Sequence, residues 1–523
     1  MARTRFISKS TTSEDTFPWI AISLIAGICV HLAIALPYVY TLNVWSDEAS
    51  SLFTTSKGLL ATIDTVFANE KQAPLYFLLL SVWRSINESV FFARILSIIA
   101  ALSAIYCFSV LVQRFVTERA AAIATFLFAV HPFVIWASLE IRVYAFVILV
   151  TCLLLEAYFR GFADLGTRRS TDCDNEKSRS KYQVGFAVIG IVGVYLHYYV
   201  GFLLVGGLAA LIATGRYREA RRYLVLLTSA GLLILPLFIM VFFQFEQRSS
   251  IPQENKTLLD GVRTVWRHFL FFVLPTELFL DTGTSIVSTI RLWIVRIWLV
   301  ATVLFFAVGR FSKVNRDMVT VGTFAATVAV FFCVANLLVG PELLAQRHAS
   351  VYFVPIVLLA ITAIDISIPK YLLWFPVLVF MVFSSYSVLT MYPENAKRGD
   401  WIRVARYLEQ HEMTDQPVVI FDAFDVPAIK THYNGKNEIL PDSGYFDFFL
   451  EGKLGTAEAF RSQIEFIIGK VPPEARHIWL ITHEKCSYGN SCRPLEDFVE
   501  DNFVVLTDQA FYKERVRLLE RRK

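Results

Sequence analysis

Residues 19–40 read WIAISLIAGICVHLAIALPYVY, and residues 41–53 continue as TLNVWSDEASSLF. The first stretch contains no Asp, Glu, Lys or Arg and is long enough for a helix that crosses a bilayer. Asp47 and Glu48 follow it closely, so we expect both carboxylates where this helix leaves the membrane. Charge at a membrane boundary is a hint of function, and a solvated helix end at the headgroup level is the simple alternative.

The composition indicates the class of protein. The chain has 523 residues, of which 55% are hydrophobic, 15% aromatic and only 18% charged. This is more apolar than an ordinary soluble globular protein, and it predicts a polytopic α-helical membrane protein. The net charge of +4 is small and gives no reason to expect a nucleic-acid partner. Because no small-residue cleavage site follows the first apolar run, we expect a retained helix rather than a signal peptide.

Apolar segments of helix length recur along the chain and predict about eleven transmembrane helices. These segments are residues 18–40, 90–113, 119–138, 141–159, 182–197, 199–214, 223–243, 287–308, 318–339, 350–366 and 371–391. The stretch 73–86 is too short to span, so we expect it along or partly inside the outer interface.

Lys and Arg gather in alternate connections, at residues 3–9, 114–119, 160–181, 216–222, 310–316 and 370. Because such residues favour the cytoplasmic side, we expect a cytoplasmic N-terminus and a location in the inner (plasma) membrane. The connections that begin at residues 41, 138, 197, 244 and 340 then face outward, as does everything after residue 391. The acidic pair is therefore expected outside the cytoplasm.

The chain changes character after residue 391. Expected helices at 400–411 and 456–468 alternate with short apolar runs at 418–421, 478–481 and 503–506, which are typical of buried strands. We therefore expect two domains, a transmembrane domain at 1–391 and a small extracytoplasmic α/β domain at 392–523.

Cys486 and Cys492 flank a short SYGNS segment in the expected outward domain. An oxidising compartment would let them form a disulfide, which we favour over a metal pair because no second Cys or His pair accompanies them.

The outward connections bring acids, cations and aromatic side chains to one membrane face. A carboxylate at such an interface is suited to act as a general base, and an arginine is suited to bind phosphate. Alternatively, Glu140 and Arg142 pair only with each other. The alternative for His197 and Tyr198 is a position at the membrane interface without a catalytic role. The residues of this group are Asp47, Glu48, Lys71, Glu140, Arg142, His197, Tyr198, Arg347 and Tyr352.

The segments WSDEASSLF, QAPLYFLLLSVW, SLEIRVYAF, LHYYVGFLL, QRHASVYFVP and GDWIRVARYLEQH, in this order, resemble bacterial glycosyltransferases of the GT-C superfamily. The resemblance is to the group related to protein mannosyltransferases and aminoarabinose transferases, which is glycosyltransferase family 39-like. It implies transfer of a sugar, outside the cytoplasm, from a polyprenyl-phosphate donor to a glycolipid, polysaccharide or protein. The sequence leaves the sugar and the acceptor open.

The resemblance also implies roles for the outward residues. Asp47 would be the base or acceptor-orienting carboxylate, Glu48 would support it, and Glu140 would be the second acid. Arg142 and Arg347 would bind the donor phosphate, and the cavity would be lined by Lys71, His197, Tyr198 and Tyr352. The segment Gln72-Ala73-Pro74 departs from the Pro-Pro or His-Pro that often precedes LYFLLL in the family.

A single displacement at the anomeric carbon would invert its configuration. We expect no cofactor and no metal, with Mg²⁺ or Mn²⁺ on the three carboxylates as the less favoured alternative. A transporter of a lipid-linked or small polar substrate is a second alternative. A transporter, however, should have charged residues in the middle of its helices and two halves that resemble each other. A non-catalytic scaffold whose outward domain binds a partner is a third.

Overall fold

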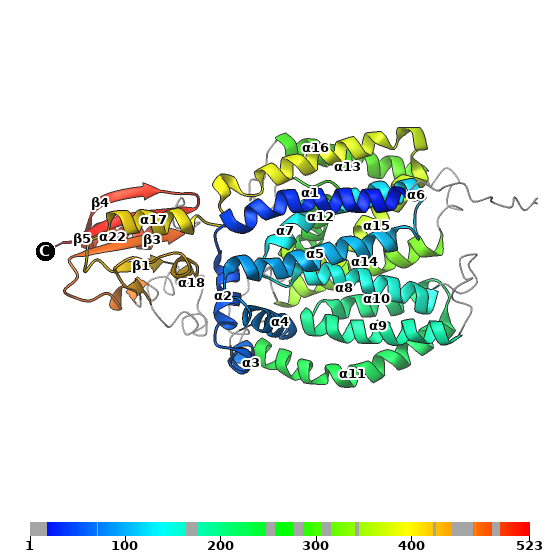
Figure 1. Ribbon diagram of the computed structural model, residues 1–523, viewed down its shortest axis with the longest axis horizontal. Helices are drawn as coiled ribbons and strands as arrows, with labels where there is room; N and C mark the ends of the chain where they lie inside the picture. The colour runs from blue at the N-terminus through cyan, green and yellow to red at the C-terminus, as the bar shows by residue number, and fades with distance from the viewer. Residues whose placement is uncertain are drawn as a thin grey trace, which may run out of the picture.

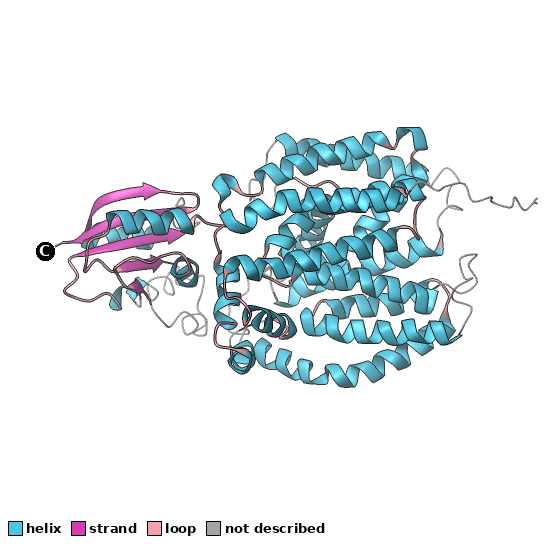
Figure 2. Ribbon diagram, viewed as in Figure 1, coloured by secondary structure: helices cyan, strands magenta, loops and turns pink. Residues whose placement is uncertain are grey.

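The apolar segments of the sequence form long helices that lie side by side, and a small α/β domain lies at one end of this bundle (Figures 1 and 2). The computed structural model describes residues 18–68, 70, 72–163, 176–246, 257–276, 286–305, 315–339, 345–421, 425–441, 464–465, 467–483 and 492–522. Helix dominates up to residue 390, and all five strands of the sheet follow it.

Each segment expected to span the membrane is helical. The corresponding elements are α1 (Trp19–Thr41), α5 (Val90–Val112), α6 (Glu118–Ala129), α7 (Pro132–Leu139), α8 (Tyr144–Tyr158), α9 (Glu176–Leu196), α10 (Val200–Ala213), α11 (Tyr217–Glu246), α13 (Ile286–Phe305), α14 (Arg316–Val339), α15 (Ser350–Ser367) and α16 (Trp374–Thr390). Within the described ranges, eight helices are long and apolar enough to cross a membrane, or nine if α6 and α7 form one bent span. The chain is thus a multi-pass membrane protein, and the count of eleven stays a prediction.

The break between α6 and α7 has a local cause. Pro132 lacks an N–H and occupies the first turn of α7, while the ring of His131 accepts a hydrogen bond from the N–H of Phe133 at 3.0 Å. The two helices meet at a bend of 43°. The short α7 then ends at Leu139, directly before Glu140.

Three short helices lie at the end of the bundle that faces the α/β domain (Figure 1). They are α2 (Ser46–Thr54), α3 (Leu59–Ala68) and α4 (Leu75–Arg84). Arg84 holds α4 to α2, because its Nη1 donates to the carbonyl oxygen of Leu52 and to the hydroxyl of Thr55, both at 2.6 Å. The stretch 73–86 thus packs beside the segment that carries the acidic pair.

Helix α12 (Leu258–Val273) was not expected from the sequence. A capping box starts it, in which Thr257 and Asp260 bond reciprocally. Its polar and apolar residues alternate at helical spacing, so its average hydropathy stays below that of a spanning segment. It packs against α14 and α15.

The α/β domain is built on a five-stranded sheet of order β2-β1-β3-β5-β4. Its strands are β1 (Val418–Phe421), β2 (Ile439–Leu440), β3 (His477–His483), β4 (Phe503–Ala510) and β5 (Glu514–Arg521). The first three strands are parallel, and β5 is antiparallel to both β3 and β4. The three expected strands are present, but β4 is an exposed edge strand after Phe503 and not the buried strand expected there. The two-residue β2 was missed, and β5 was missed because charged residues break up its apolar run.

Helices cover both faces of this sheet. Val418 and Ile420 pack on the side of α17 (Trp401–His411) and α18 (Val426–Lys430), in an apolar core that continues into the bundle. Val419 and Leu480 point to the other side, toward α22 (Arg493–Asn502). Of the two expected helices, 400–411 is confirmed, and 456–468 lies mostly outside the described residues.

Candidate active site

Arg94 lies inside the apolar helix α5 and fixes the segment that leads into α2. Its Nη1 donates to the carbonyl oxygens of Val39 (3.0 Å) and Leu42 (2.8 Å), and its Nη2 donates to that of Asn43 (2.7 Å). These oxygens lie at the C-terminal end of α1, where backbone acceptors lack helical partners and a cation is favourable. The buried guanidinium group therefore sets the position of α2 relative to α1.

Glu48 is fully buried and is held by two cations. Its Oε1 lies 2.7 Å from Nζ of Lys397, and its Oε2 lies 3.3 Å from Nη2 of Arg94. The backbone N–H of Ile141 also donates to Oε1, at 2.9 Å. Burial alone would raise the pKa of Glu48, but the charges of Lys397 and Arg94 hold it below its usual value. Glu48 thus joins α2 to α5 and to the connection between α16 and α17.

Glu140 shares Lys397 with Glu48. Nζ of Lys397 lies 3.0 Å from Oε1 of Glu140, and the indole N–H of Trp45 donates to Oε2 at 2.8 Å. The hydroxyl of Ser97 donates to the backbone oxygen of Glu140 at 2.6 Å. Burial, opposed in part by the charge of Lys397, raises the pKa of Glu140. Of the two glutamates, Glu140 is thus the better proton acceptor.

Asp47 faces two arginines from other parts of the bundle. Its Oδ2 lies 3.4 Å from Nη1 of Arg347, in the 3-10 turn η6 (Gln346–Ala349), and 3.8 Å from Nη2 of Arg142. Nη1 of Arg142 also donates to the backbone oxygen of Asp47 (3.0 Å) and to the hydroxyl of Ser51 (2.9 Å). Burial would raise the pKa of Asp47, but Arg347 and Arg142 hold it below its usual value.

Several polar atoms around Asp47 are buried and have no hydrogen-bond partner among the described residues. They include Oδ2 of Asp47 itself, Nε of Arg142 and Nε of Arg347. Buried polar atoms in native proteins are nearly always satisfied by protein, water or ligand. We therefore expect water or a polar ligand between these side chains.

Trp45 and Arg398 extend this arrangement toward the α/β domain. The guanidinium group of Arg398 lies 4.3 Å from the ring centroid of Trp45, and that of Arg347 lies 5.8 Å from the same ring. A cation over an indole face is attracted by the ring. Arg398 is also close enough to Asp47 to help lower its pKa. Three guanidinium groups, including that of Arg142, thus surround one carboxylate and leave an excess of positive charge.

The connection between α16 and α17 brings two of these cations to the site. Oδ1 of Asn43 accepts a hydrogen bond from the N–H of Lys397 at 2.8 Å, and its Nδ2 donates to the carbonyl oxygen of Gly399. Arg398 and Gly399 have positive φ angles of 49° and 145°. Glycine adopts this region readily, and its presence permits a tight turn. The turn places Lys397 against the two glutamates and Arg398 over Trp45.

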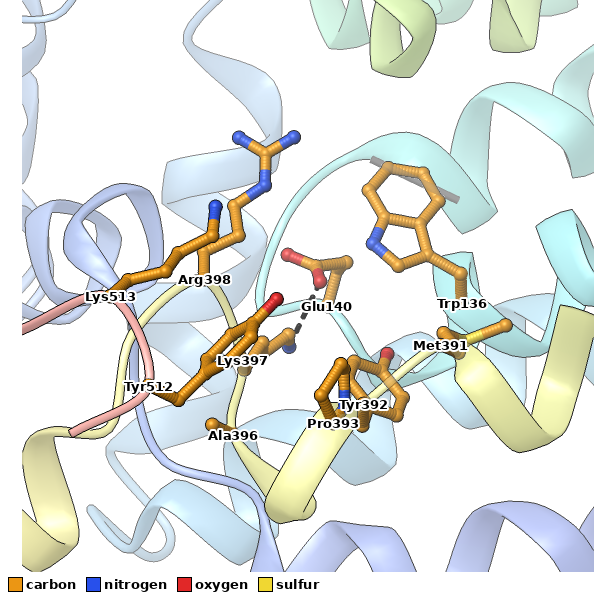
Figure 3. Close-up of a pocket in the computed structure, with 10 residues that line it drawn as sticks. All are labelled: Trp136, Glu140, Met391, Tyr392, Pro393, Ala396, Lys397, Arg398, Tyr512 and Lys513. Carbon is orange, nitrogen blue, oxygen red and sulfur yellow. Dashed lines mark ion pairs between the residues drawn. The ribbon is translucent and has the colours of Figure 1, made fainter. Parts of the chain in front are cut away.

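A pocket lies where the bundle meets the α/β domain, with Glu140 in its wall (Figure 3). Further lining residues come from three parts of the chain: Trp136 and Tyr392 from the bundle, Lys397 and Arg398 from the connection, and Tyr512 and Lys513 from the turn between β4 and β5. Figure 3 shows Lys397 paired with Glu140 and the side chains of Tyr512 and Lys513 next to the connection.

His197 lies beside this site, between α9 and α10. Its Nε2 is 3.5 Å from Nδ1 of His348, and its Nδ1 faces the N–H of Tyr199 at 3.3 Å. Burial, together with the charge of Arg142, lowers the pKa of His197 to about 4. The ring is therefore neutral at pH 7.

The two predicted tyrosines lie in packed surroundings. Tyr352 is fully buried in α15, and its hydroxyl is bonded to Nδ1 of His268 in α12 at 2.6 Å. Tyr198 is half-buried and packs against the apolar core. Tyr352 therefore ties α12 to the bundle, and its role as a cavity-lining residue stays a prediction.

Two of the predicted residues, Lys71 and Cys486, lie outside the described residues. Cys492 is disulfide-bonded, and its pairing with Cys486 stays a prediction. Within the described ranges, no three His, Cys, Asp or Glu side chains lie together as a metal ion would require.

Sequence reasoning missed Arg94, Lys397 and Arg398, although each had a signal. Arg94 is a lone charge inside an apolar span, and such a charge is expected to have a specific partner. Lys397 and Arg398 follow the last spanning segment on the side expected to face outward, where the charge rule disfavours basic residues. Basic residues that break that rule are candidates for binding.

No protein-family model and no curated protein matches the chain. Among solved structures, the apo oligosaccharyltransferase from Archaeoglobus fulgidus is 12% identical, with a TM-score of 0.50 over 90% of this chain and 70% of that one. ArnT from Cupriavidus metallidurans bound to undecaprenyl phosphate is 14% identical, with a TM-score of 0.46 over 95% of this chain and 97% of that one. AglB from Archaeoglobus fulgidus, in complex with an inhibitory peptide and a dolichol-phosphate, is 13% identical, with a TM-score of 0.46 over 90% and 70%. The chain thus has the GT-C fold expected from its sequence.

Proposed function

We propose that the protein is a membrane glycosyltransferase that moves a sugar from a polyprenyl-phosphate donor to a hydroxyl acceptor at the extracytoplasmic face. Residues 1–391 would perform the transfer, and residues 392–523 would form the outward α/β domain. The observation that carries the proposal is the placement of Arg142 and Arg347 on either side of Asp47, whose Oδ2 has no hydrogen bond among the described residues.

The charges of the site suit a phosphate leaving group. Arg142, Arg347 and Arg398 exceed the charge of Asp47, and a buried arginine fork binds phosphate oxygens in pairs. Electrostatic stabilisation of this kind is strongest where water is excluded. The long apolar helices beside the site would hold the polyprenyl chain in the bilayer.

In the proposed reaction the acceptor hydroxyl attacks the anomeric carbon and gives its proton to the carboxylate of Asp47. A carbon–oxygen bond to the acceptor forms as the bond to the lipid phosphate breaks, and Arg347 and Arg142 take up the phosphate charge. The single displacement inverts the anomeric carbon. Glu48 would support the site through Lys397, and Glu140 is the second carboxylate near the reacting atoms.

The test is transfer of a labelled sugar from polyprenyl phosphate by the purified full chain. We expect Asp47→Asn to lower kcat by about 100-fold or more, because loss of a general base costs this much. Glu118→Gln, at the exposed start of α6, is the matched control and should keep wild-type turnover. Near wild-type transfer by Asp47→Asn, or substrate uptake into vesicles without transfer, would contradict the proposal.

A further inference from the structure

The turn between β4 and β5 reaches from the far end of the chain to the pocket at Glu140. Tyr512 and Lys513 lie at the tip of this turn and line the pocket together with Lys397 and Arg398 (Figure 3). Of the ten lining residues, four come from the connection after Tyr392 and two from this turn. The α/β domain belongs to the site itself rather than to a separate module.

The turn is anchored on both sides of its tip. The ring of Phe511 packs against Tyr407 of α17, with ring centroids 5.6 Å apart, and the N–H of Phe511 donates to the carbonyl oxygen of Glu514 at 2.8 Å. The carboxylate of Glu514 is buried and bonds to Nδ1 of His483 at 2.7 Å. These contacts hold the two residues between the anchors in a defined position.

Glu514 also joins the turn to the connection that carries the other cations. Its Oε2 accepts a hydrogen bond from the N–H of Asp400 at 2.8 Å. Asn43 holds the same connection from the bundle side, through Lys397 and Gly399. The tip of the turn, the connection and the start of α2 therefore form one continuous support for the pocket.

The lining of the pocket has the chemistry of a sugar-phosphate site. Arg398 and Lys513 supply positive charge, while Lys397 is neutralised by its ion pairs with Glu48 and Glu140. Aromatic rings such as that of Tyr512 offer flat apolar faces on which a sugar ring packs. Nζ of Lys513 lies 5.9 Å from the ring centroid of Tyr512, so the cation and the ring occupy the same part of the wall.

We propose that Tyr512 and Lys513 contact the lipid-linked sugar phosphate, with Tyr512 packing on the sugar and Lys513 binding the phosphate. The inference rests on the proposed function, and it assigns part of donor recognition to the α/β domain.

The test measures binding of undecaprenyl phosphate to the detergent-solubilised full chain. Lys513 has a positive φ of 68°, which Asn tolerates well, so Lys513→Asn removes the charge and preserves the turn. We expect its Kd to rise by about tenfold or more, because a charged hydrogen bond is lost. The dependence of Kd on salt should also weaken. Lys436→Asn, exposed beside the opposite edge of the sheet, is the control and should bind as the wild type does.

The inference fails if Lys513→Asn binds within about twofold of the wild type, or if the wild type does not bind this lipid phosphate. Tyr512→Ala is the second test variant. We expect it to raise KM for the complete donor and to change Kd for undecaprenyl phosphate less, because this lipid lacks the sugar. Equal effects on both would contradict the role of Tyr512. Sugar transfer by the wild type is measured separately, so a protein that binds the lipid phosphate through Lys513 yet transfers no sugar contradicts the proposed function alone.

Discussion

Asp47 and Glu48 are adjacent in α2, yet their side chains meet different partners. Consecutive helical residues do not share a face. Glu48 therefore turns inward to Arg94 and Lys397, whereas Asp47 turns to Arg142 and Arg347. The oxygens of Glu48 are taken up by cations and a backbone N–H, while Oδ2 of Asp47 lies buried beside Arg142 and Arg347 with no hydrogen bond among the described residues. We therefore expect that replacing Glu48 mainly lowers stability, whereas replacing Asp47 mainly lowers the rate of sugar transfer.

Replacing Glu48 with Gln should destabilise the protein by roughly 3–5 kcal/mol, because buried Arg94 loses its counter-charge and Lys397 keeps only that of Glu140. The measurement is the melting temperature in detergent, with Glu118→Gln as the exposed control. A double variant that also carries Lys397→Met should lose further stability, since it leaves the buried carboxylate of Glu140 without its cation. An unchanged melting temperature for Glu48→Gln would show that the pair does not hold the two parts together.

The pH dependence of kcat/KM distinguishes Asp47 from Glu140 as the general base. The pKa of Asp47 is held below its ordinary value of 3.8, so as the base it stays ionised, and kcat/KM stays flat as the pH falls toward that value. The pKa of Glu140 is raised above its ordinary value of 4.5, so as the base it would be protonated at higher pH. We expect the flat profile. A tenfold fall per pH unit that begins above 4.5 would assign the base to Glu140.

At the scale of elements, the connection between α16 and α17 decides the geometry of the site. Four of its residues, Glu394, Asn395, Arg398 and Gly399, have positive φ. Such conformations persist only where the surroundings enforce them. Asn43 in the bundle and Glu514 in the sheet hold the connection in this conformation, because they accept hydrogen bonds from the N–H groups of Lys397 and Asp400.

Gly399→Ala should damage both the connection and the activity. A Cβ at this position would collide with the carboxylate of Glu514 and lie 2.8 Å from Nε1 of Trp401, at a φ that alanine rarely adopts. We expect a loss of stability of roughly 1–3 kcal/mol and a larger relative loss of transfer, because Lys397 and Arg398 shift. Gly185→Ala in α9 is the control, since a Cβ there has open space, and alanine favours a helix. Wild-type transfer by Gly399→Ala would contradict a role for this turn.

At the scale of the whole molecule, the bundle and the α/β domain meet through polar contacts and a shared apolar core. The hydroxyl of Ser46 is bonded to Asp425, and the N–H of Val44 donates to Nε2 of His432 at 3.0 Å. The core of the bundle continues to Trp401 and the face of the sheet beneath α17. The two parts are therefore expected to support one another.

Glu514 makes this junction sensitive to pH. Burial, opposed by the hydrogen bond from His483, raises the pKa of Glu514 to about 7 from an ordinary value of 4.5. The folded state thus binds this proton more tightly than the unfolded state does. The contribution of the bound proton to the free energy of unfolding is therefore complete below pH 4.5 and is lost as the pH rises through about 7. Glu514→Gln cannot titrate and should lose less stability than the wild type between about pH 5 and about pH 8. The measurement is the melting temperature of both proteins at the two pH values. An equal fall in melting temperature for the wild type and Glu514→Gln would contradict the role of Glu514 in this pH dependence.

Hydropathy and helix length identified the long helices of the bundle, and short apolar runs identified three of the five strands. These patterns are local, because a spanning helix or a buried strand satisfies its own backbone within a short stretch or one sheet. Helix α12 and strand β5 were missed because each mixes charged with apolar residues, and only packing reveals which face is buried. Strand β2 was missed because it is only two residues long.

The sequence by itself determined that this chain is a membrane protein and that Asp47 and Glu48 lie at a helix exit. It did not determine their partners. Lys397 pairs with Glu48 across 349 residues, and Tyr512 and Lys513 reach the same pocket from the last hairpin. Ion pairs between such distant residues depend on how the helices and the sheet are stacked, because charge acts over a few ångströms in space and not along the chain. The tertiary structure alone therefore decided that Glu48 is enclosed by Arg94 and Lys397 and that Glu140 faces the pocket.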